Sequence, residues 1–235
     1  MKASWLHNND RKQLILFCNG WGMDGNPFRH LASIEYDIYM LYDYQKLALP
    51  AEMAQILSRY EEIHLIGWSM GVWAGQKLFA EQKNIFKRTL AVNGTLCPIH
   101  DRYGIPTEIF ADTLAGFGEA ARFKFYRRMC REKSNFRSFL AKQPQRSLED
   151  QRQELSALGE MADCTPVDQA LYRQVIIAEY DWIIPSENQQ HFWRDKNVTL
   201  ISGFHYLFNL WQSWDHLLTF AEWPPESGDK PGSAS

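Results

Sequence analysis

The chain has 235 residues, of which 45% are hydrophobic and 14% aromatic. This length suits one sizeable domain with a proper core and perhaps a small inserted subdomain, rather than two full domains. The formal net charge of −3 argues against general affinity for nucleic acid. No apolar run approaches the roughly 20 residues of a membrane span, and the first ten residues lack the apolar core of a signal peptide. We therefore expect a cytoplasmic protein with neither nucleic acid nor a membrane as its partner.

The cysteines and histidines show no metal-binding pattern. The four cysteines are far apart and form no C-x-x-C pair: Cys18, Cys97, Cys130 and Cys164. Buried or incidental thiols are favoured over disulfides or a zinc site. No H-E-x-x-H or similar cluster is present, so we expect neither a metal nor another cofactor.

Short apolar runs alternate with segments of helical spacing along most of the chain. Strands are predicted at residues 1–7, 13–18, 36–42, 63–67, 88–94, 174–180 and 198–201. Helices are predicted at 26–31, 50–60, directly after residue 69, at 186–193 and at 209–223. This alternation predicts an α/β fold with a mostly parallel sheet flanked by helices.

The strand rhythm stops between residues 95 and 166. Apolar residues recur there at steps of four, at Phe117, Ala121, Phe125 and Met129, as in a helix. We therefore expect a helical lid insert at 95–166 and a core made of residues 1–94 and 167–223. Residues 224–235 are rich in proline, glycine and serine and are predicted to form a flexible tail.

Ser69 lies in the sequence Gly67-Trp68-Ser69-Met70-Gly71, between an apolar run and a segment able to form a helix. A strand, a tight turn and a helix in this order are typical of a nucleophile elbow. The two glycines lack the Cβ atoms that would collide where strand and helix approach. The pattern predicts Ser69 as a nucleophile and the backbone N–H of Met70 as an oxyanion donor.

A serine nucleophile needs a base and a carboxylate that orients it. Asp181 and His205 each follow a late predicted strand, where ligand sites form in open α/β sheets. Taken singly, either residue could be an ordinary turn or surface residue. The order Ser69, Asp181, His205 is the one expected of α/β-hydrolases, and the conjunction favours a catalytic triad.

A second oxyanion donor is expected in the turn after residue 18, which reads Asn19-Gly20-Trp21-Gly22. Alone, this would be an ordinary turn between a strand and a helix. Paired with Ser69, it makes the backbone N–H of Trp21 the candidate.

The expected insert also carries a run of basic residues. They are Arg122, Lys124, Arg127, Arg128 and Arg131, of which Lys124, Arg128 and Arg131 would share one helical stripe. A solvated face is the simpler interpretation. A docking surface for an acidic partner or a phosphate is the alternative.

Taken together, these segments resemble the BioG family of pimeloyl-[acyl-carrier protein] methyl ester esterases, which are α/β-hydrolases. The resemblance covers most of the chain and is carried by residues 17–24, 67–72, 91–95, 180–185 and 204–208. The turn at Asn19 departs from the His-Gly-Trp-Gly of the related BioH type and is similar to BioG. The resemblance implies a serine carboxylesterase of biotin biosynthesis that hydrolyses the methyl ester of pimeloyl-acyl carrier protein and releases methanol.

The resemblance also implies roles for the lid. The acidic acyl carrier protein would be the partner of the basic run, and aromatic residues would line a channel for the pimeloyl chain, although core packing is the simpler explanation for each of them taken singly. These aromatic candidates are Trp21, Trp68, Phe125 and Phe139. Two alternatives remain open: a broader small-acyl carboxylesterase or thioesterase, and a non-catalytic acyl-binding protein of the same fold.

Overall fold

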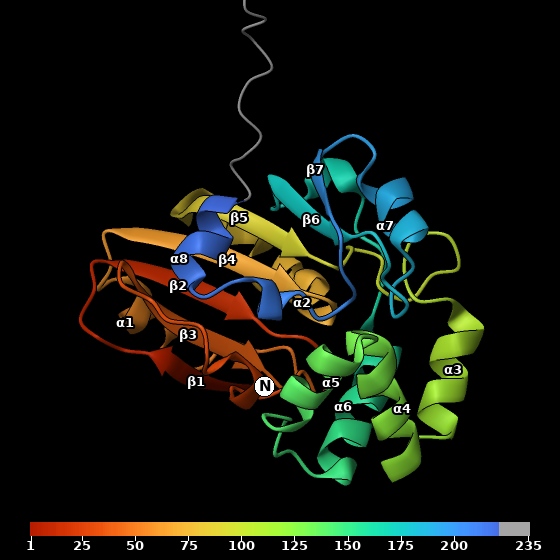
Figure 1. The fold of residues 1–235 in the computed structure, drawn as a ribbon. Coiled ribbons are helices and arrows are strands. Elements are labelled where there is room, and N and C mark those ends of the chain that lie inside the picture. The colour runs from red at the N-terminus through yellow and green to blue at the C-terminus, as the bar shows by residue number, and fades with distance from the viewer. Residues whose placement is uncertain (221–235) are drawn as a thin grey trace, which may run out of the picture.

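A computed structural model describes residues 1–220, and its central element is a seven-stranded sheet (Figure 1). The strand order is β1-β3-β2-β4-β5-β6-β7, and only β1 runs antiparallel to its neighbour. The strands are β1 (Lys2–His7), β2 (Gln13–Cys18), β3 (Tyr36–Tyr42), β4 (Glu62–Trp68), β5 (Phe86–Val92), β6 (Gln174–Ala178) and β7 (Asn197–Ile201). The prediction of a mostly parallel sheet flanked by helices is confirmed.

Helices cover both faces of the sheet. Along β2, Leu14 and Leu16 face one buried cluster, which includes side chains of α1 (Met53–Leu57), α2 (Met70–Phe79) and α7 (Ser186–Trp193). Ile15 and Phe17 face the opposite cluster, which includes side chains of α8 (Trp214–Phe220). This alternation follows from the period of two in a strand and places a core on each face.

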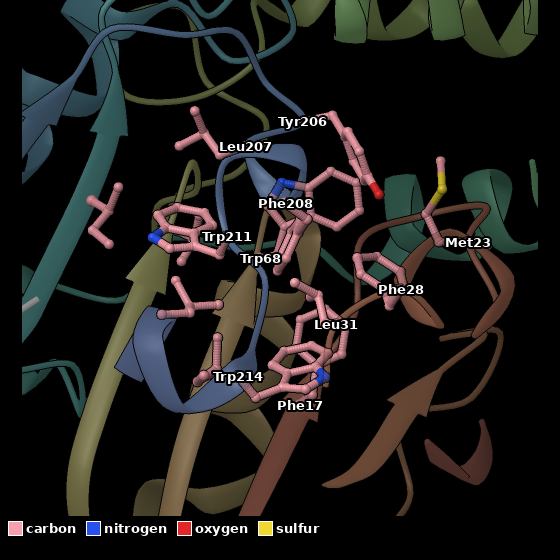
Figure 2. Close-up of a cluster of buried hydrophobic side chains, with 14 of the residues drawn as sticks. Phe17, Met23, Phe28, Leu31, Trp68, Tyr206, Leu207, Phe208, Trp211 and Trp214 are labelled. Atoms are coloured by element: carbon pink, nitrogen blue, oxygen red, sulfur yellow. The ribbon is translucent and has the colours of Figure 1, made fainter. Parts of the chain in front are cut away.

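The core on the α8 face is rich in aromatic rings. Phe17, Phe28, Trp68, Phe208 and Trp214 crowd together there, as Figure 2 shows. Phe28 packs edge-on against Phe17, Trp68 and Phe208 with ring centroids 5.0, 5.8 and 4.8 Å apart. Such edge-to-face pairs add to the stabilisation that comes from burying the rings. The strand that leads to Ser69 is therefore packed tightly on this face.

Four helices lie between β5 and β6, in the segment predicted to be helical. They are α3 (Thr107–Ala115), α4 (Glu119–Cys130), α5 (Lys133–Leu140) and α6 (Leu148–Met161). Figure 1 shows them as one group beyond the arrowheads of the central strands. We call residues 95–166 the helical segment. Its position at the carboxyl ends of the strands brings it over the predicted catalytic residues.

Several predicted helix boundaries were wrong. The expected helix at 26–31 is one 3-10 turn, η1 (Asn26–Phe28), and the helix expected at 50–60 is only α1. A second 3-10 turn, η4 (Phe208–Leu210), precedes α8, which begins at Trp214 instead of residue 209. Ser213 Oγ accepts the His216 N–H, as an N-terminal cap does, and this bond defines the later start. Residues 221–223 and the predicted tail at 224–235 lie outside the described residues.

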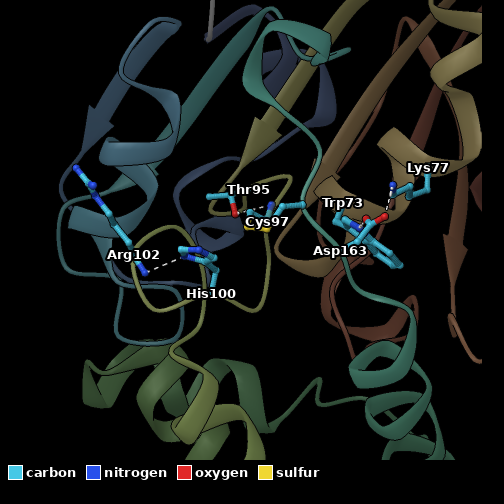
Figure 3. Close-up of a disulfide and its surroundings, with 8 residues drawn as sticks. Trp73, Lys77, Thr95, Cys97, His100, Arg102 and Asp163 are labelled. Atoms are coloured by element: carbon cyan, nitrogen blue, oxygen red, sulfur yellow. Dashed lines mark hydrogen bonds and ion pairs between the residues drawn. A yellow bond between two sulfur atoms is a disulfide. The ribbon is translucent and has the colours of Figure 1, made fainter.

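The expectation of four free thiols was also wrong. Cys97 and Cys164 form a disulfide across a sequence separation of 67 residues (Figure 3). Folding brings them together because Cys97 follows β5 and Cys164 precedes β6, and these strands are neighbours in the sheet. Cys18 and Cys130 are free and buried, and burial raises the pKa of the Cys130 thiol to about 12.

Within the described residues no helix is both long and apolar enough to cross a membrane.

Candidate active site

Ser69 occupies the turn between β4 and α2 in a conformation that few residues adopt. Its φ is 57° and its ψ is −127°, outside the three main regions that L-residues favour. A Cβ at Gly67 would lie 2.5 Å from the Tyr172 hydroxyl, and one at Gly71 would collide with the carbonyl oxygens of Cys18 and Asn19. The two glycines therefore let α2 approach β2 and β4 closely and leave Ser69 at the tip of the turn, as a nucleophile elbow requires.

The three residues predicted as a triad lie in one hydrogen-bonded row. His205 Nε2 is 2.9 Å from Ser69 Oγ, and His205 Nδ1 is 2.7 Å from Asp181 Oδ2. All three are buried, with 6%, 1% and 4% of their surface exposed in the order Ser69, His205, Asp181. The geometry suits proton transfer from the serine hydroxyl to the imidazole, with the carboxylate fixing the tautomer.

The carboxylate of Asp181 is held by several donors. The backbone N–H groups of Ile183 and Ile184 donate to Oδ1, at 2.8 and 3.1 Å. The side-chain amide of Gln189, on α7, donates to Oδ2 at 2.8 Å. These bonds satisfy a buried charge and fix the oxygen that faces His205.

Asn93 orients the loop that carries His205. Its amide donates to the carbonyl of His205 at 2.9 Å and to that of Phe204 at 3.2 Å. Its carbonyl accepts the Ala178 N–H at the end of β6 at 2.7 Å. No sequence pattern predicts a role for Asn93 or Gln189. The position of Asn93 at a strand end, directly before a glycine, was the one local signal.

Both predicted oxyanion donors border the pocket at Ser69. Met70 is the first residue of α2, and Trp21 lies in the turn after β2. Within residues 1–220, neither backbone N–H donates to a protein acceptor. Both N–H groups are free to donate to a substrate oxygen on which negative charge develops. Their roles as oxyanion donors remain predictions.

The pocket above Ser69 is mostly apolar and has a volume of about 570 Å³ including its open mouth. Trp68 and Phe125, both predicted to bind substrate, line it. The other lining side chains come from the turn after β2, the helical segment and the Asp181 loop: Met23, Ile105, Ile109, Phe110, Thr113, Arg128, Leu155 and Ile183. Such a lining suits an acyl chain better than a charged ligand.

Phe139 does not line this pocket, contrary to the prediction. It packs against Tyr126 and Tyr206 with ring centroids 5.0 and 5.1 Å apart, and it belongs to the core on the α8 face. The reason is that the face of α5 that carries Phe139 packs against Tyr126 of α4 and against the loop that carries Tyr206. The spacing of apolar residues along one helix does not indicate which other element that helix packs against.

The predicted basic run is divided by the structure. Arg128 donates to the carbonyl of Trp182 at 2.8 Å, and the guanidinium of Arg131 lies 3.8 Å from the ring centre of Trp182. Arg122 is half-buried and donates to the carbonyl of Arg146, whereas Lys124 and Arg127 are exposed. Arg131 is not part of the expected helical stripe, because α4 ends at Cys130 and Arg131 has a φ of 55°.

No grouping of three or more His, Cys, Asp or Glu side chains in residues 1–220 has the geometry to hold a metal ion.

Comparison with known proteins places the chain in a family. A family model described as "Pimeloyl-ACP methyl esterase BioG" matches residues 1–217. The chain belongs to the BioG family. A crystal structure of SeMet-BioG from Haemophilus influenzae is 33% identical, with a TM-score of 0.85, over 93% of this chain and 100% of that one. The resemblance stated from the motifs is therefore confirmed.

Two further proteins show how far the similarity of sequence and of fold extends. A protein of Bacteroides fragilis named malonyl-[acyl-carrier protein] O-methyltransferase is 39% identical over 83% of this chain, but the chain spans only 40% of it. An enol-lactonase from Burkholderia xenovorans is 13% identical with a TM-score of 0.65, over 94% of this chain and 93% of that one. At that identity the likeness shows only the shared α/β-hydrolase fold, which confirms the predicted fold class.

Proposed function

We propose that the chain is a serine carboxylesterase that hydrolyses the methyl ester of pimeloyl-acyl carrier protein in biotin biosynthesis. The observation that carries the proposal is the row Ser69, His205 and Asp181 at an apolar pocket with two unoccupied backbone N–H groups. BioG family membership supports the substrate, and the name of the Bacteroides relative associates that longer protein with methylation on an acyl carrier protein.

In the proposed acylation, Ser69 Oγ attacks the ester carbonyl while His205 Nε2 takes the hydroxyl proton. Asp181 stabilises the imidazolium, and the N–H groups of Trp21 and Met70 donate to the oxyanion. The tetrahedral intermediate expels the methoxy group, which leaves as methanol with the proton from His205. Water activated by His205 then attacks the acyl-enzyme, and collapse restores the Ser69 hydroxyl and frees the pimeloyl carboxylate.

The helical segment is the proposed lid over this chemistry, on a core that includes residues 1–94 and 167–220. Ile109 and Phe110 of α3, Phe125 of α4 and Leu155 of α6 supply much of the apolar pocket lining. These side chains would surround the acyl chain and exclude water from the ester. The apolar lining thus supports an acyl ester rather than a sugar or nucleotide as the substrate.

The carrier would approach over α4. Lys124, Arg127, Arg128 and Arg131 are all exposed, and Arg128 also lies at the pocket itself. Arg122 and Arg131 would contribute positive potential from the contacts that they already make. An acidic acyl carrier protein and its phosphate group fit such a positively charged surface. Biotin biosynthesis on an acyl carrier protein is also consistent with a cytoplasmic enzyme.

The deciding experiment incubates the protein and its Ser69→Ala variant with pimeloyl-acyl carrier protein methyl ester and follows loss of the methyl group by mass spectrometry. We expect demethylation by the parent and none by the variant. Cleavage of short nitrophenyl esters without cleavage of the carrier ester would favour the broader carboxylesterase or thioesterase. Absence of both activities would favour a non-catalytic acyl-binding protein.

A further inference from the structure

The turn that carries Trp21 is held from the side of the helical segment by a fully buried carboxylate. Glu154, on α6, has no exposed surface. Its Oε2 accepts the backbone N–H of Gly22 at 3.0 Å, and its Oε1 accepts that of Tyr44 at 3.0 Å. Because Gly22 N–H points into α6, it is unavailable to the pocket, and Trp21 is the neighbouring residue whose N–H is left without a protein acceptor within the described residues.

Gln151 holds the same turn from one helical turn earlier. Its side-chain amide donates to the Gly22 carbonyl at 2.7 Å, and its backbone carbonyl accepts the Trp21 indole N–H at 2.8 Å. The Trp21 ring also packs edge-on against Phe117 and Phe125, with centroids 5.2 and 5.0 Å away. Two residues of α6 therefore make three hydrogen bonds to Trp21 and Gly22.

Glu154 is itself anchored by charge. Arg146 forms an ion pair with Glu154 and also pairs with Asp43 and Asp150, whose oxygens lie 3.0 and 2.6 Å away. Lys2 pairs with the same two aspartates. The buried carboxylate thus has a cation and two N–H donors, which offset the cost of removing it from water.

We propose that Glu154 and Gln151 are positioning residues that fix the turn so that the Trp21 N–H faces the oxyanion. The proposal rests on the esterase function above and gives the helical segment a second task besides covering the substrate. A donor accelerates acyl transfer only if it already points to where charge develops. The bonds to the Gly22 N–H and to its carbonyl hold the two peptides that follow Trp21, and the bond from the indole holds the Trp21 side chain, so the backbone at Trp21 has little freedom to turn its own N–H away from the pocket.

The test uses Glu154→Gln and Gln151→Met, two substitutions of nearly unchanged shape. Glu154 accepts hydrogen bonds from the Gly22 N–H, the Tyr44 N–H and Arg146, and in Glu154→Gln the new NH₂ group would face one of these donors. In Gln151→Met the Gly22 carbonyl would lose the side-chain amide that donates to it. Removal of a whole oxyanion donor costs about 100- to 1,000-fold in kcat. For a donor that is misaligned instead of removed, we expect kcat on p-nitrophenyl butyrate to fall about tenfold, with KM within about twofold. Affinity for phenylboronic acid, which forms a tetrahedral adduct on the serine, should fall by a similar factor.

Asp150→Asn is the matched control. Asp150 lies on α6 and binds Arg146 and Lys2, but it makes no contact with Trp21 or Gly22. The substitution should lower thermal stability without changing kcat or boronic acid affinity. Equal kinetic losses in Asp150→Asn, or unchanged kcat and boronic acid affinity in a folded Gln151→Met, would overturn the proposal. Both probes act at Ser69 without a carrier, so failure to cleave the carrier ester would leave this test intact.

Discussion

The carbonyl of Met129 accepts a hydrogen bond of 3.1 Å from the backbone N–H of Tyr206. Tyr206 directly follows His205, and Met129 lies in the last turn of α4, so a helix of the helical segment is bonded to the loop of the candidate base. Arg128, one residue earlier, donates to Trp182, which directly follows Asp181. One end of α4 thus contacts the loops of two candidate triad members.

Asp181→Asn should lower kcat by about 10³- to 10⁴-fold. The amide keeps an oxygen for the N–H groups of Ile183 and Ile184, so the loop should remain in place, but it no longer fixes the tautomer of His205 or stabilises its cation. Stopped assays on p-nitrophenyl butyrate measure the loss, with circular dichroism as the control for folding. Near-parental kcat in a folded variant would exclude Asp181 from the triad.

Charge reversal at both Lys124 and Arg127 should weaken use of the carrier ester alone. Both side chains are exposed and lie outside the pocket lining, so small esters should be hydrolysed at the parental rate. We expect KM for the carrier ester to rise about tenfold, and the parent's KM to rise with salt as screening grows. Charge reversal at both Lys83, in η2 (Ala80–Ile85), and Lys87, in β5, is the matched control, because both residues are exposed and the change in net charge is the same. Equal effects at both places would show that only net charge matters.

His64 should make the fold less stable in mild acid. The side chain of His64 lies on β4 and is 1% exposed. Burial is the main reason that its pKa falls from 6.5 to about 4; the positive charges of Arg88 and Lys87 also lower the pKa, and the negative charge of Glu62 partly opposes them. Since the unfolded chain binds the proton more readily, His64 contributes stability above pH 6.5 that is lost as the pH falls toward 4. The shift corresponds to at most about 3 kcal/mol. Urea unfolding of the parent and His64→Gln from pH 4 to 8 should show a shallower pH dependence in the variant; parallel curves would contradict the assignment.

The Cys97–Cys164 disulfide should be detectable by mass. Alkylation of the unreduced, denatured protein should add two labels, on Cys18 and Cys130, and prior reduction should raise the number to four. The chain-entropy estimate for a loop of this length is about 4 kcal/mol of stability, so Cys97→Ala with Cys164→Ala should unfold at lower urea. Four labels without reduction would show that the two thiols stay free in solution.

The sheet and the elbow could be predicted because their signals are local. The apolar runs of β2 and β4, and the glycines on both sides of Ser69, indicate their own structure within a few residues. Asp181 and His205 could be chosen because parallel strands end at one edge of a sheet. Their order along the chain supplied the remaining information.

The errors arose where distant residues decide the structure. Glu154 lies in an otherwise ordinary amphipathic helix, and its partners Gly22 and Tyr44 are 132 and 110 residues away. The sequence does not say whether Phe139 faces the pocket or the core, and the packing of α5 places it in the core on the α8 face. Phe117 fits the step-of-four pattern of α4, yet it precedes that helix, because Gly118 is its N-cap.

Cys97 and Cys164 lie near the two ends of the helical segment, and their Cα atoms are 4.1 Å apart. Its two ends therefore meet at one point, beside two strands that pair with each other independently of it. The four helices could therefore be exchanged as a single unit without breaking the pairing of β5 with β6. The limit on that exchange is α6, since any replacement must again supply acceptors and donors for the turn at Trp21 and Gly22. Under the proposed function, changes along α3 and α4 would alter the acyl pocket, whereas changes in α6 would also alter the turn that carries the oxyanion donor.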